Sequence, residues 1–291
     1  MTLNQRSRGI RGIRPSRLAK GVVIAVLAAV GINHMVWAVV QWPMGDLEIY
    51  LAAAERLRSG EPLYLVADAF NSYWYSPWFA ASMMPLTFLP ESVAAVGWSA
   101  LLLACTAAVG VVLWTERTVA ARIVAVMAVP ALFAVSAGGN VQALIVLALL
   151  VALHRPSGPL WVALAASLKF TPILFVLVFV ARREWGRAGI SLLLSALLII
   201  PAFLMGFSLD RVQGWQGMAP SVLAFGLPIY VMVVGACCLA ALFGPVKYSA
   251  VAAATGAVLA LPRLFVYDVT LVAIGAVDER RAATPPRASE H

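Results

Sequence analysis

Residues 21–41 read GVVIAVLAAVGINHMVWAVVQ and contain no charged side chain. An α-helix rises ~1.5 Å per residue, so about 20 apolar residues are enough to cross the hydrocarbon core of a bilayer. This stretch therefore predicts a transmembrane helix. The composition of the 291-residue chain agrees, because 62% of its residues are hydrophobic, only 12% are charged and the mean hydropathy is +0.91. Such values lie outside the range of soluble domains and indicate an integral membrane protein.

Further apolar segments follow at short intervals, several of them interrupted by Pro or Gly. The pattern predicts an all-α polytopic membrane protein with about ten transmembrane helices. We expect one transmembrane domain over residues 21–277 and a disordered cytoplasmic tail over residues 278–291. The ten segments are 21–41, 76–90, 92–114, 119–137, 140–154, 159–181, 188–207, 220–243, 246–262 and 264–277.

Basic residues decide the predicted orientation. Residues 1–20 carry six basic side chains and no acidic one, which is typical of a cytoplasmic segment before a first span. Alternate threading from a cytoplasmic N-terminus places thirteen basic residues inside and seven outside, with Arg155 outside and Arg187 inside. We therefore expect a plasma-membrane protein with both termini in the cytoplasm. This topology explains the net charge of +8, and no soluble domain remains to bind nucleic acid.

One long polar stretch interrupts the apolar pattern. Residues 42–78 read WPMGDLEIYLAAAERLRSGEPLYLVADAFNSYWYSPW, and residues 42–75 form the first external loop in the predicted topology. Apolar and charged side chains alternate there with helical spacing, and Gly60 is placed to end the helix. We expect an amphipathic helix that lies along the membrane interface, followed by an interfacial belt of aromatic residues. The apolar face comprises Leu47, Tyr50, Leu51, Ala54 and Leu57, and the belt comprises Trp42, Tyr64, Tyr73, Trp74, Tyr75 and Trp78.

Asp46 stands at the expected start of this helix, directly after Pro43 and Gly45. As a helix N-cap, its carboxylate would accept hydrogen bonds from backbone N–H groups. As a site residue, it would perform chemistry at the external face, and the two roles do not exclude each other. In either case the partial positive charge of the helix N-terminus is expected to keep the carboxylate ionised.

The order of several short motifs resembles glycosyltransferase family 87. These motifs are GDLEIYLAAAERLRSGEPLY (45–64), YWYSPWFAASMMPLTFLP (73–90), GGNVQALIVLALL (138–150), ALAASLKFTPILFVLVFVARREW (163–185) and LPRLFVYDVTLVAI (261–274). The resemblance runs over about residues 20–278. It implies a GT-C-like fold and transfer of a sugar, most often mannose, from a polyprenyl-phosphate donor to a lipid or glycan acceptor. Ser76-Pro77 departs from the two prolines that the family more often has there.

The chemistry supports the same interpretation independently. A nucleotide-sugar donor needs a strand, a glycine-rich turn and a helix, and this chain has no room for such a domain. A lipid-anchored donor would present its sugar phosphate at the membrane interface. There, a carboxylate can accept the proton of the attacking hydroxyl while a cation stabilises the departing phosphate. In GT-C enzymes the base is an acid early in the first external loop, and the resemblance therefore implies Asp46. Glu48 diverges from it on a helix, so we expect neither a metal nor a cofactor.

The resemblance and the charges also suggest substrate-binding residues, several of which have plain alternatives. Lys169 either contacts the donor or lies at a helix break in LKFTP with its amine extended toward water. Arg211 either grips the phosphate or pairs with Asp210, and Asp268 either orders the donor site or pairs with Arg263. In the threaded topology Asn140 and Gln142 lie at a cytoplasmic break and serve only packing. The full substrate-binding set is Glu48, Tyr50, Tyr64, Tyr75, Lys169, Arg211, Arg263, Tyr267 and Asp268.

A second class of function remains open at this point, namely a secondary transporter or lipid flippase. Transporters place paired ionisable residues and matching helix breaks in two related halves of the chain. Here Lys169 is the one ionisable residue that the threading leaves within a span, and the other polar residues gather at the external face. The pattern therefore favours a glycosyltransferase whose partners are a polyprenyl-phosphate sugar, an acceptor and membrane lipids.

Overall fold

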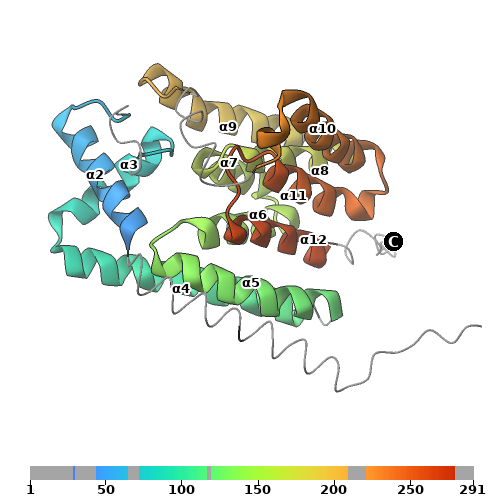
Figure 1. Ribbon diagram of the computed structural model, residues 1–291, viewed down its shortest axis with the longest axis horizontal. Helices are drawn as coiled ribbons and strands as arrows, with labels where there is room; N and C mark the ends of the chain where they lie inside the picture. Colours follow the sequence, from blue (N-terminus) through green and yellow to red (C-terminus); the bar gives the residue numbers. More distant parts are fainter. Residues whose placement is uncertain (1–28, 30–43, 65–71, 117–118, 209–220, 279–291) are drawn as a thin grey trace, which may run out of the picture.

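The structure, a computed structural model, describes residues 29, 44–64, 72–116, 119–208 and 221–278. All regular secondary structure in these ranges is helical (Figure 1). Apart from positions 29 and 278, the predicted first span and tail lie outside the described residues. The elements are α2 (Gly45–Ser59), α3 (Pro77–Met83), η1 (Met84–Phe88), α4 (Glu91–Thr115), α5 (Val119–Ala137), α6 (Gln142–His154), α7 (Gly158–Leu168), η2 (Thr171–Phe175), α8 (Val176–Ala181), α9 (Trp185–Leu204), η4 (Val222–Phe225), α10 (Leu227–Phe243), η5 (Val246–Tyr248), α11 (Ser249–Leu259), η6 (Val266–Val272) and α12 (Ala273–Asp278).

Three of the described helices, α4, α5 and α9, are long and apolar enough to cross a membrane. The longest, α4, has 25 residues and rises about 37 Å at ~1.5 Å per residue. α4 and α5 pack side by side (Figure 1). The predicted segments 92–114 and 119–137 are thus continuous helices, and the segment 188–207 is one as far as Leu204. The other apolar helices among the described residues are shorter than 18 residues, and the number of about ten spans stays a prediction.

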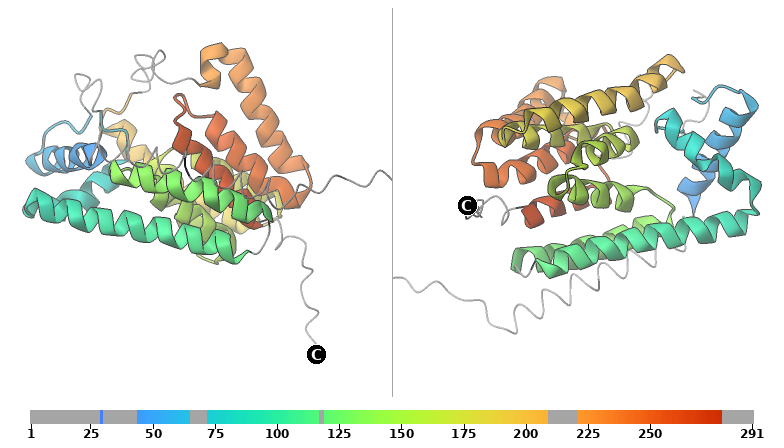
Figure 2. Two further views of the ribbon diagram at one scale, coloured as in Figure 1. Left: turned by 60° about the horizontal axis from the view of Figure 1, so that its bottom comes forward. Right: turned by 180° about the vertical axis from the view of Figure 1, so that it is seen from behind.

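The predicted span at residues 76–90 is not one continuous helix. It divides into α3, whose seven residues rise only about 10 Å, and the five-residue 3₁₀ turn η1. Pro77 and Pro85 occupy the first turns of these two pieces, where a missing N–H costs little. Both pieces pack against α2, at the end of the molecule where α4 begins (Figures 1 and 2). Neither piece alone is long enough to cross a bilayer.

The predicted span at residues 159–181 is also broken. α7 ends at Leu168, Lys169 has an extended backbone with φ −141° and ψ 126°, and η2 then leads into α8. Pro172 accounts for the break, because a proline lacks the N–H that a continuous helix would need. The predicted helix break at Lys169 is therefore present, but the prediction that its amine extends toward water is wrong, because Lys169 Nζ donates to Gln142 and Asp268.

The chain reverses direction at this break. Arg187, in the first turn of α9, donates hydrogen bonds to the carbonyls of Ala152 and Arg155. The start of α9, and with it the end of α8, therefore lies at the same end of the bundle as the start of α7. It follows that α7 and the η2–α8 stretch form a hairpin with Lys169 at its tip.

These contacts divide the bundle into two ends and correct the predicted threading. The threading placed Arg155 outside and Arg187 inside, but the two residues are in contact. The prediction was wrong because residues 76–90 do not form one crossing helix and residues 159–181 turn back. We call the end where α2 begins, α5 ends, α6 begins and α7 ends the site end. Arg155 and Arg187 lie at the opposite end.

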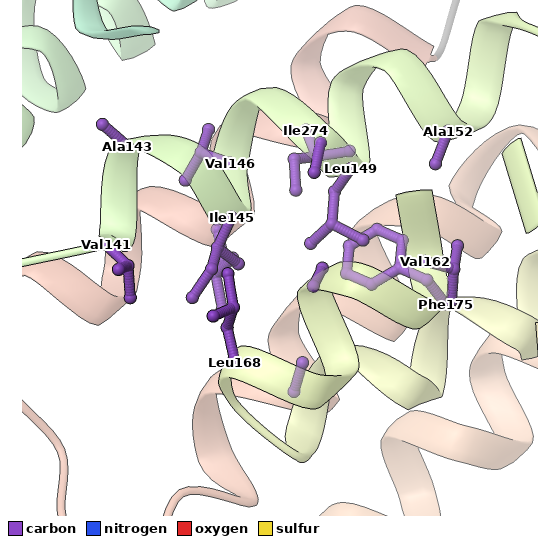
Figure 3. Close-up of a cluster of buried hydrophobic side chains, with 14 of the residues drawn as sticks. Val141, Ala143, Ile145, Val146, Leu149, Ala152, Val162, Leu168, Phe175 and Ile274 are labelled. Atoms are coloured by element: carbon purple, nitrogen blue, oxygen red, sulfur yellow. The ribbon is translucent and has the colours of Figure 1, made fainter. Parts of the chain in front are cut away.

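The core surrounds α6, which is apolar on every side and packs against α4, α5, α7 and α12. Figure 3 shows Ile145 and Leu149 of α6 among the side chains of Leu168, Phe175 and Ile274. All five are buried. Many residues of α6 and α7 are alanines, whose small side chains let the helices approach closely. This rigid centre fixes the position of both ends of α6, including the polar residues that precede it.

Candidate active site

Asp46 lies in the first turn of α2 at the site end. The helix begins at Gly45 with Met44 as its N-cap, so the sequence-based interpretation of Asp46 as the N-cap is wrong. The start of α2 is attached to the end of α5, because the N–H of Met44 donates to Ala137 O (3.0 Å) and that of Asp46 to Gly138 O (2.9 Å). Two backbone hydrogen bonds therefore hold Asp46 against the residues that follow α5.

Those residues form a tight turn. Gly139 has φ +84°, a left-handed conformation that glycine adopts without strain, and a Cβ there would lie 2.9 Å from the backbone nitrogen of Leu47. The indole N–H of Trp98, on α4, donates to Gly139 O at 2.8 Å. The turn thus brings the chain of α2 very close and presents the next residue, Asn140, to it.

Asn140 and Asp46 are in direct contact. The Nδ2 of Asn140 donates to Oδ2 of Asp46 at 2.6 Å, and Oδ1 of Asn140 accepts the backbone N–H of Gln142 at 3.0 Å. The prediction that Asn140 and Gln142 lie at a cytoplasmic break, far from the reaction, is therefore wrong. Asn140 lies on the same side as Asp46 because α5 ends at the site end.

Gln142 continues the polar network toward α7 and η6. Its side chain is fully buried, with 0% exposure. Its Oε1 accepts a hydrogen bond from Lys169 Nζ at 2.7 Å, and its Nε2 donates to Thr270 Oγ1 at 3.2 Å. In a low-dielectric interior such a side chain must be satisfied on both polar atoms, and here it is. Gln142 therefore connects two distant parts of the chain.

Lys169 forms a buried ion pair with Asp268. The Nζ–Oδ1 distance is 2.6 Å, and the exposed fractions of the two side chains are 15% and 1%. The other carboxylate oxygen of Asp268 accepts the backbone N–H of Phe265 at 2.9 Å, and the Lys169 ammonium also lies 4.8 Å from the ring centre of Tyr267. Sequence reasoning offered Arg263 as the partner of Asp268 and did not consider Lys169. The pair joins the tip of the α7–α8 hairpin to η6.

The tyrosines of the predicted first external loop pack close to one another near the start of α2. Tyr50 and Tyr75 are joined through their hydroxyls at 3.0 Å, and the hydroxyl of Tyr64 donates to Tyr75 O at 2.8 Å. Tyr64 and Tyr73 were predicted to belong to an aromatic belt at the membrane interface, but both are buried inside the protein. Their rings pack against one another, and that of Tyr64 also packs against Phe207, so these two side chains contact protein rings in place of the lipid interface.

Arg263 lies over aromatic rings. Its guanidinium carbon is 5.2 Å from the ring centre of Trp74 and 5.3 Å from that of Phe265, and Phe265 stacks on Tyr267 at 5.3 Å. Aromatic ring faces attract a guanidinium and restrict its orientation. Arg263 is thus held by the residues around it in a partly buried position.

The charges around Asp46 have opposing effects on its proton affinity. Burial raises the pKa of the Asp46 carboxyl above its ordinary value, while the Asn140 hydrogen bond and the charges of Lys169 and Arg263 lower it. The expectation that the helix N-terminus would dominate is therefore not met. Burial and the Asp46 charge also raise the pKa of the Tyr75 phenol, which keeps that hydroxyl protonated. A partly buried carboxylate with a raised pKa suits a group that accepts a proton.

Glu48 is not part of this assembly. It is on the exposed face of α2, and its side chain makes no hydrogen bond or ion pair with the other described residues. Arg211 lies outside the described residues. Within the described ranges, no three His, Cys, Asp or Glu side chains gather closely enough to hold a metal ion.

The sequence carried a signal for the two residues that reasoning misplaced. Asn140 and Gln142 stand in GGNVQALIVLALL, where a glycine pair and two amides precede a wholly apolar helix. Amides beside a glycine turn at a helix start are typical of a buried polar site. The threading error moved them to the wrong face, so this signal was read as packing.

The fold and the site together define an all-helical membrane protein in which a carboxylate, two cations and several tyrosines converge at one end of the bundle. The sequence model of glycosyltransferase family 87 matches residues 73–284, and the chain belongs to this family of membrane glycosyltransferases. Among curated proteins and solved structures, no match to the chain was found. Family membership favours the transferase over a transporter or flippase. The matched range includes Asn140, Gln142, Lys169 and Asp268 but begins after Asp46.

Proposed function

We propose that this protein transfers mannose from a polyprenyl-phosphate donor to a lipid or glycan acceptor, with Asp46 as the general base. The observation that carries the proposal is the contact of Asp46 with Asn140. Asp46 lies before the residues that the family model matches, and this hydrogen bond joins it to Asn140, which lies within them. Lys169 and Arg263 lie at the same end of the bundle.

The reaction would proceed in one displacement. The acceptor hydroxyl oxygen attacks the anomeric carbon and forms the new glycosidic bond, while the bond from that carbon to the phosphate oxygen breaks. Polyprenyl phosphate leaves as an anion, and the proton of the attacking hydroxyl passes to the Asp46 carboxylate. General-base assistance of this kind contributes typically about 10²- to 10⁴-fold in rate.

Arg263 is the best placed described residue to stabilise the leaving phosphate. Lys169 already donates hydrogen bonds to Asp268 and Gln142. Arg263 is held by Trp74 and Phe265, and a guanidinium binds phosphate oxygens more specifically than an ammonium does. Arg211 remains a second candidate. We propose that Tyr50, Tyr75 and Tyr267 bind the hydroxyl groups of the sugar, because all three lie close enough to Asp46 to interact with its charge.

A lipid-linked donor suits a protein whose described residues form helices and no strands. Donor and acceptor would then reach the site from the bilayer or from its surface, and no nucleotide-binding domain is needed. No cofactor is required for the displacement.

We also propose that the site end faces outward and that both termini are cytoplasmic. In the structure the basic residues of the opposite end outnumber those of the site end. The described basic residues at the opposite end are Arg122, Arg155, Arg182, Arg183, Arg187 and Lys247, and those at the site end are Arg56, Arg58, Lys169 and Arg263. The positive-inside rule then places the opposite end, with the basic residues 1–20, in the cytoplasm.

The test uses purified protein in detergent or liposomes with a radiolabelled polyprenyl-phosphate mannose and an extract of membrane lipids as acceptors. We expect labelled product from the lipid-linked donor and none from a nucleotide-linked mannose. Asp46→Asn should reduce turnover by at least about a hundredfold, while the control Glu55→Gln, an exposed carboxylate on the same helix, should not. Transfer from the nucleotide sugar alone would refute the donor, and near-normal turnover of folded Asp46→Asn would refute the base.

A further inference from the structure

The side chain of Asn140 is held in a single orientation. It is buried, with 5% exposure, and both of its polar groups are used. Oδ1 accepts the Gln142 N–H, which leaves Nδ2 directed to Asp46. A flipped amide would place an oxygen against the carboxylate and a nitrogen against an N–H donor, which is unfavourable at both contacts. Asn140 is therefore an oriented donor and not an adaptable one.

The other carboxylate oxygen of Asp46 is in a different situation. Oδ2 is bound by Asn140, whereas Oδ1 has no hydrogen-bond partner among the residues that the structure describes. A general base needs a fixed rotamer and one lone pair directed at its substrate. The contact with Asn140 fixes the rotamer of Asp46 and leaves the lone pairs of Oδ1 for the substrate.

Gln142 lies between this contact and a buried positive charge and uses a separate group for each. Lys169 Nζ donates to Gln142 Oε1, Gln142 N donates to Asn140 Oδ1, and Asn140 Nδ2 donates to Asp46. The side-chain amide of Gln142, bound by Lys169 and Thr270, holds this residue in place, and its backbone N–H binds Asn140. The orientation of Asn140 is thus set by the backbone at the start of α6.

We infer that Asn140 is the positioning residue of the catalytic base: it holds Asp46 by one oxygen and leaves the other free for the acceptor hydroxyl. This inference rests on the proposed function of Asp46 and adds to it a residue with a separate role. The charged and titratable groups around Asp46 are Lys169 of the α7–α8 hairpin, Arg263 and Tyr267 near η6, Tyr75 before α3, and Tyr50 on its own helix. None of these groups is altered by a change at Asn140.

The first test is the pH dependence of kcat in Asn140→Asp and Asn140→Ala. In Asn140→Asp a second carboxylate would face Asp46, and the two would share a proton, so the acid limb of the profile should move upward by about one pH unit or more. In Asn140→Ala the loss of a donor to the anion should move it the same way, with kcat lowered about tenfold or more and KM changed much less. Thr106→Val, which removes a buried hydroxyl contact between α4 and α5, is the matched control and should leave the profile unchanged.

A second measurement does not depend on turnover. The difference in unfolding midpoint between each protein and its Asp46→Asn counterpart, followed against pH, reports the protonation of Asp46. The pH at which this difference changes should be higher in the Asn140→Ala background. The Asn140→Ala measurement also provides the test if Asn140→Asp does not fold. If neither the acid limb nor the pH dependence of the stability difference shifts, the positioning role of Asn140 is overturned. An inactive Asp46→Asn would in that case still support Asp46 as the general base. High turnover of Asp46→Asn would instead remove the base assignment itself.

Discussion

Replacing Lys169 by Met is expected to destabilise the protein strongly, because it leaves the Asp268 carboxylate buried without its partner. Asp268 is 1% exposed and cannot be solvated in place. Breaking a buried ion pair by removal of one member costs about 3–5 kcal/mol. At roughly 2–4 °C per kcal/mol for a chain of this size, the unfolding midpoint should fall by roughly 6–20 °C.

The protein contains its own control for this prediction. Arg58 and Glu55 form an ion pair on α2 whose side chains are 45% and 47% exposed, and solvent screening leaves such a pair little effect on stability. Arg58→Met should therefore shift the midpoint much less than Lys169→Met does. The double variant Lys169→Met/Asp268→Asn should recover more than half of the loss, because asparagine removes the stranded charge and keeps an oxygen for the Phe265 N–H.

The assay is intrinsic tryptophan fluorescence of the detergent-solubilised proteins during heating at one fixed scan rate, since membrane proteins of this size rarely unfold reversibly. Equal shifts in Lys169→Met and Arg58→Met would show that the buried pair is no more important than the exposed one. A double variant as unstable as Lys169→Met would show that the stranded charge is not the cause of the loss.

Three further outcomes are expected. Gly139→Ala should destabilise by more than about 1 kcal/mol in thermal unfolding and reduce turnover, because of its φ of +84° and the approach of Leu47, whereas Gly97→Ala in α4, where a Cβ meets open space, should be neutral or stabilising. Burial raises the pKa of Asp46 in the folded protein, so the contribution of this group to stability is fully present below the ordinary aspartate pKa and is lost as the pH rises through the raised pKa. Asp46→Asn should therefore raise the unfolding midpoint at neutral pH and should not raise it below about pH 4. In a cysteine-free background, Ser59→Cys should react with an impermeant maleimide from outside the cell and Ser157→Cys only after permeabilisation, and the reverse pattern would refute the proposed orientation.

Local patterns predicted the elements whose cause is local. The helix of the first external loop appears as α2 with Gly60 as its left-handed C-cap, because apolar spacing and a terminal glycine are sufficient signals. The three long apolar helices follow from hydropathy alone. The break at Lys169 was visible in LKFTP, since proline removes a donor wherever it stands. Residues 76–90 were misjudged because hydropathy does not distinguish a crossing helix from a short apolar helix packed on α2.

The sequence by itself determined that this is a helical membrane protein, because a bilayer requires backbone groups to be satisfied within each helix, so that the apolar spans are visible in the composition. Its ordered motifs carried the resemblance to glycosyltransferase family 87. The sequence also identified Asp46, Lys169 and Asp268 as candidates. Only the tertiary structure decided which of them meet. Asp46 contacts Asn140 across 94 positions, and Lys169 contacts Asp268 across 99. Such contacts depend on which end of the bundle each helix reaches and on how closely glycine and alanine let helices approach, and neither property is encoded in the periodicity of a single segment.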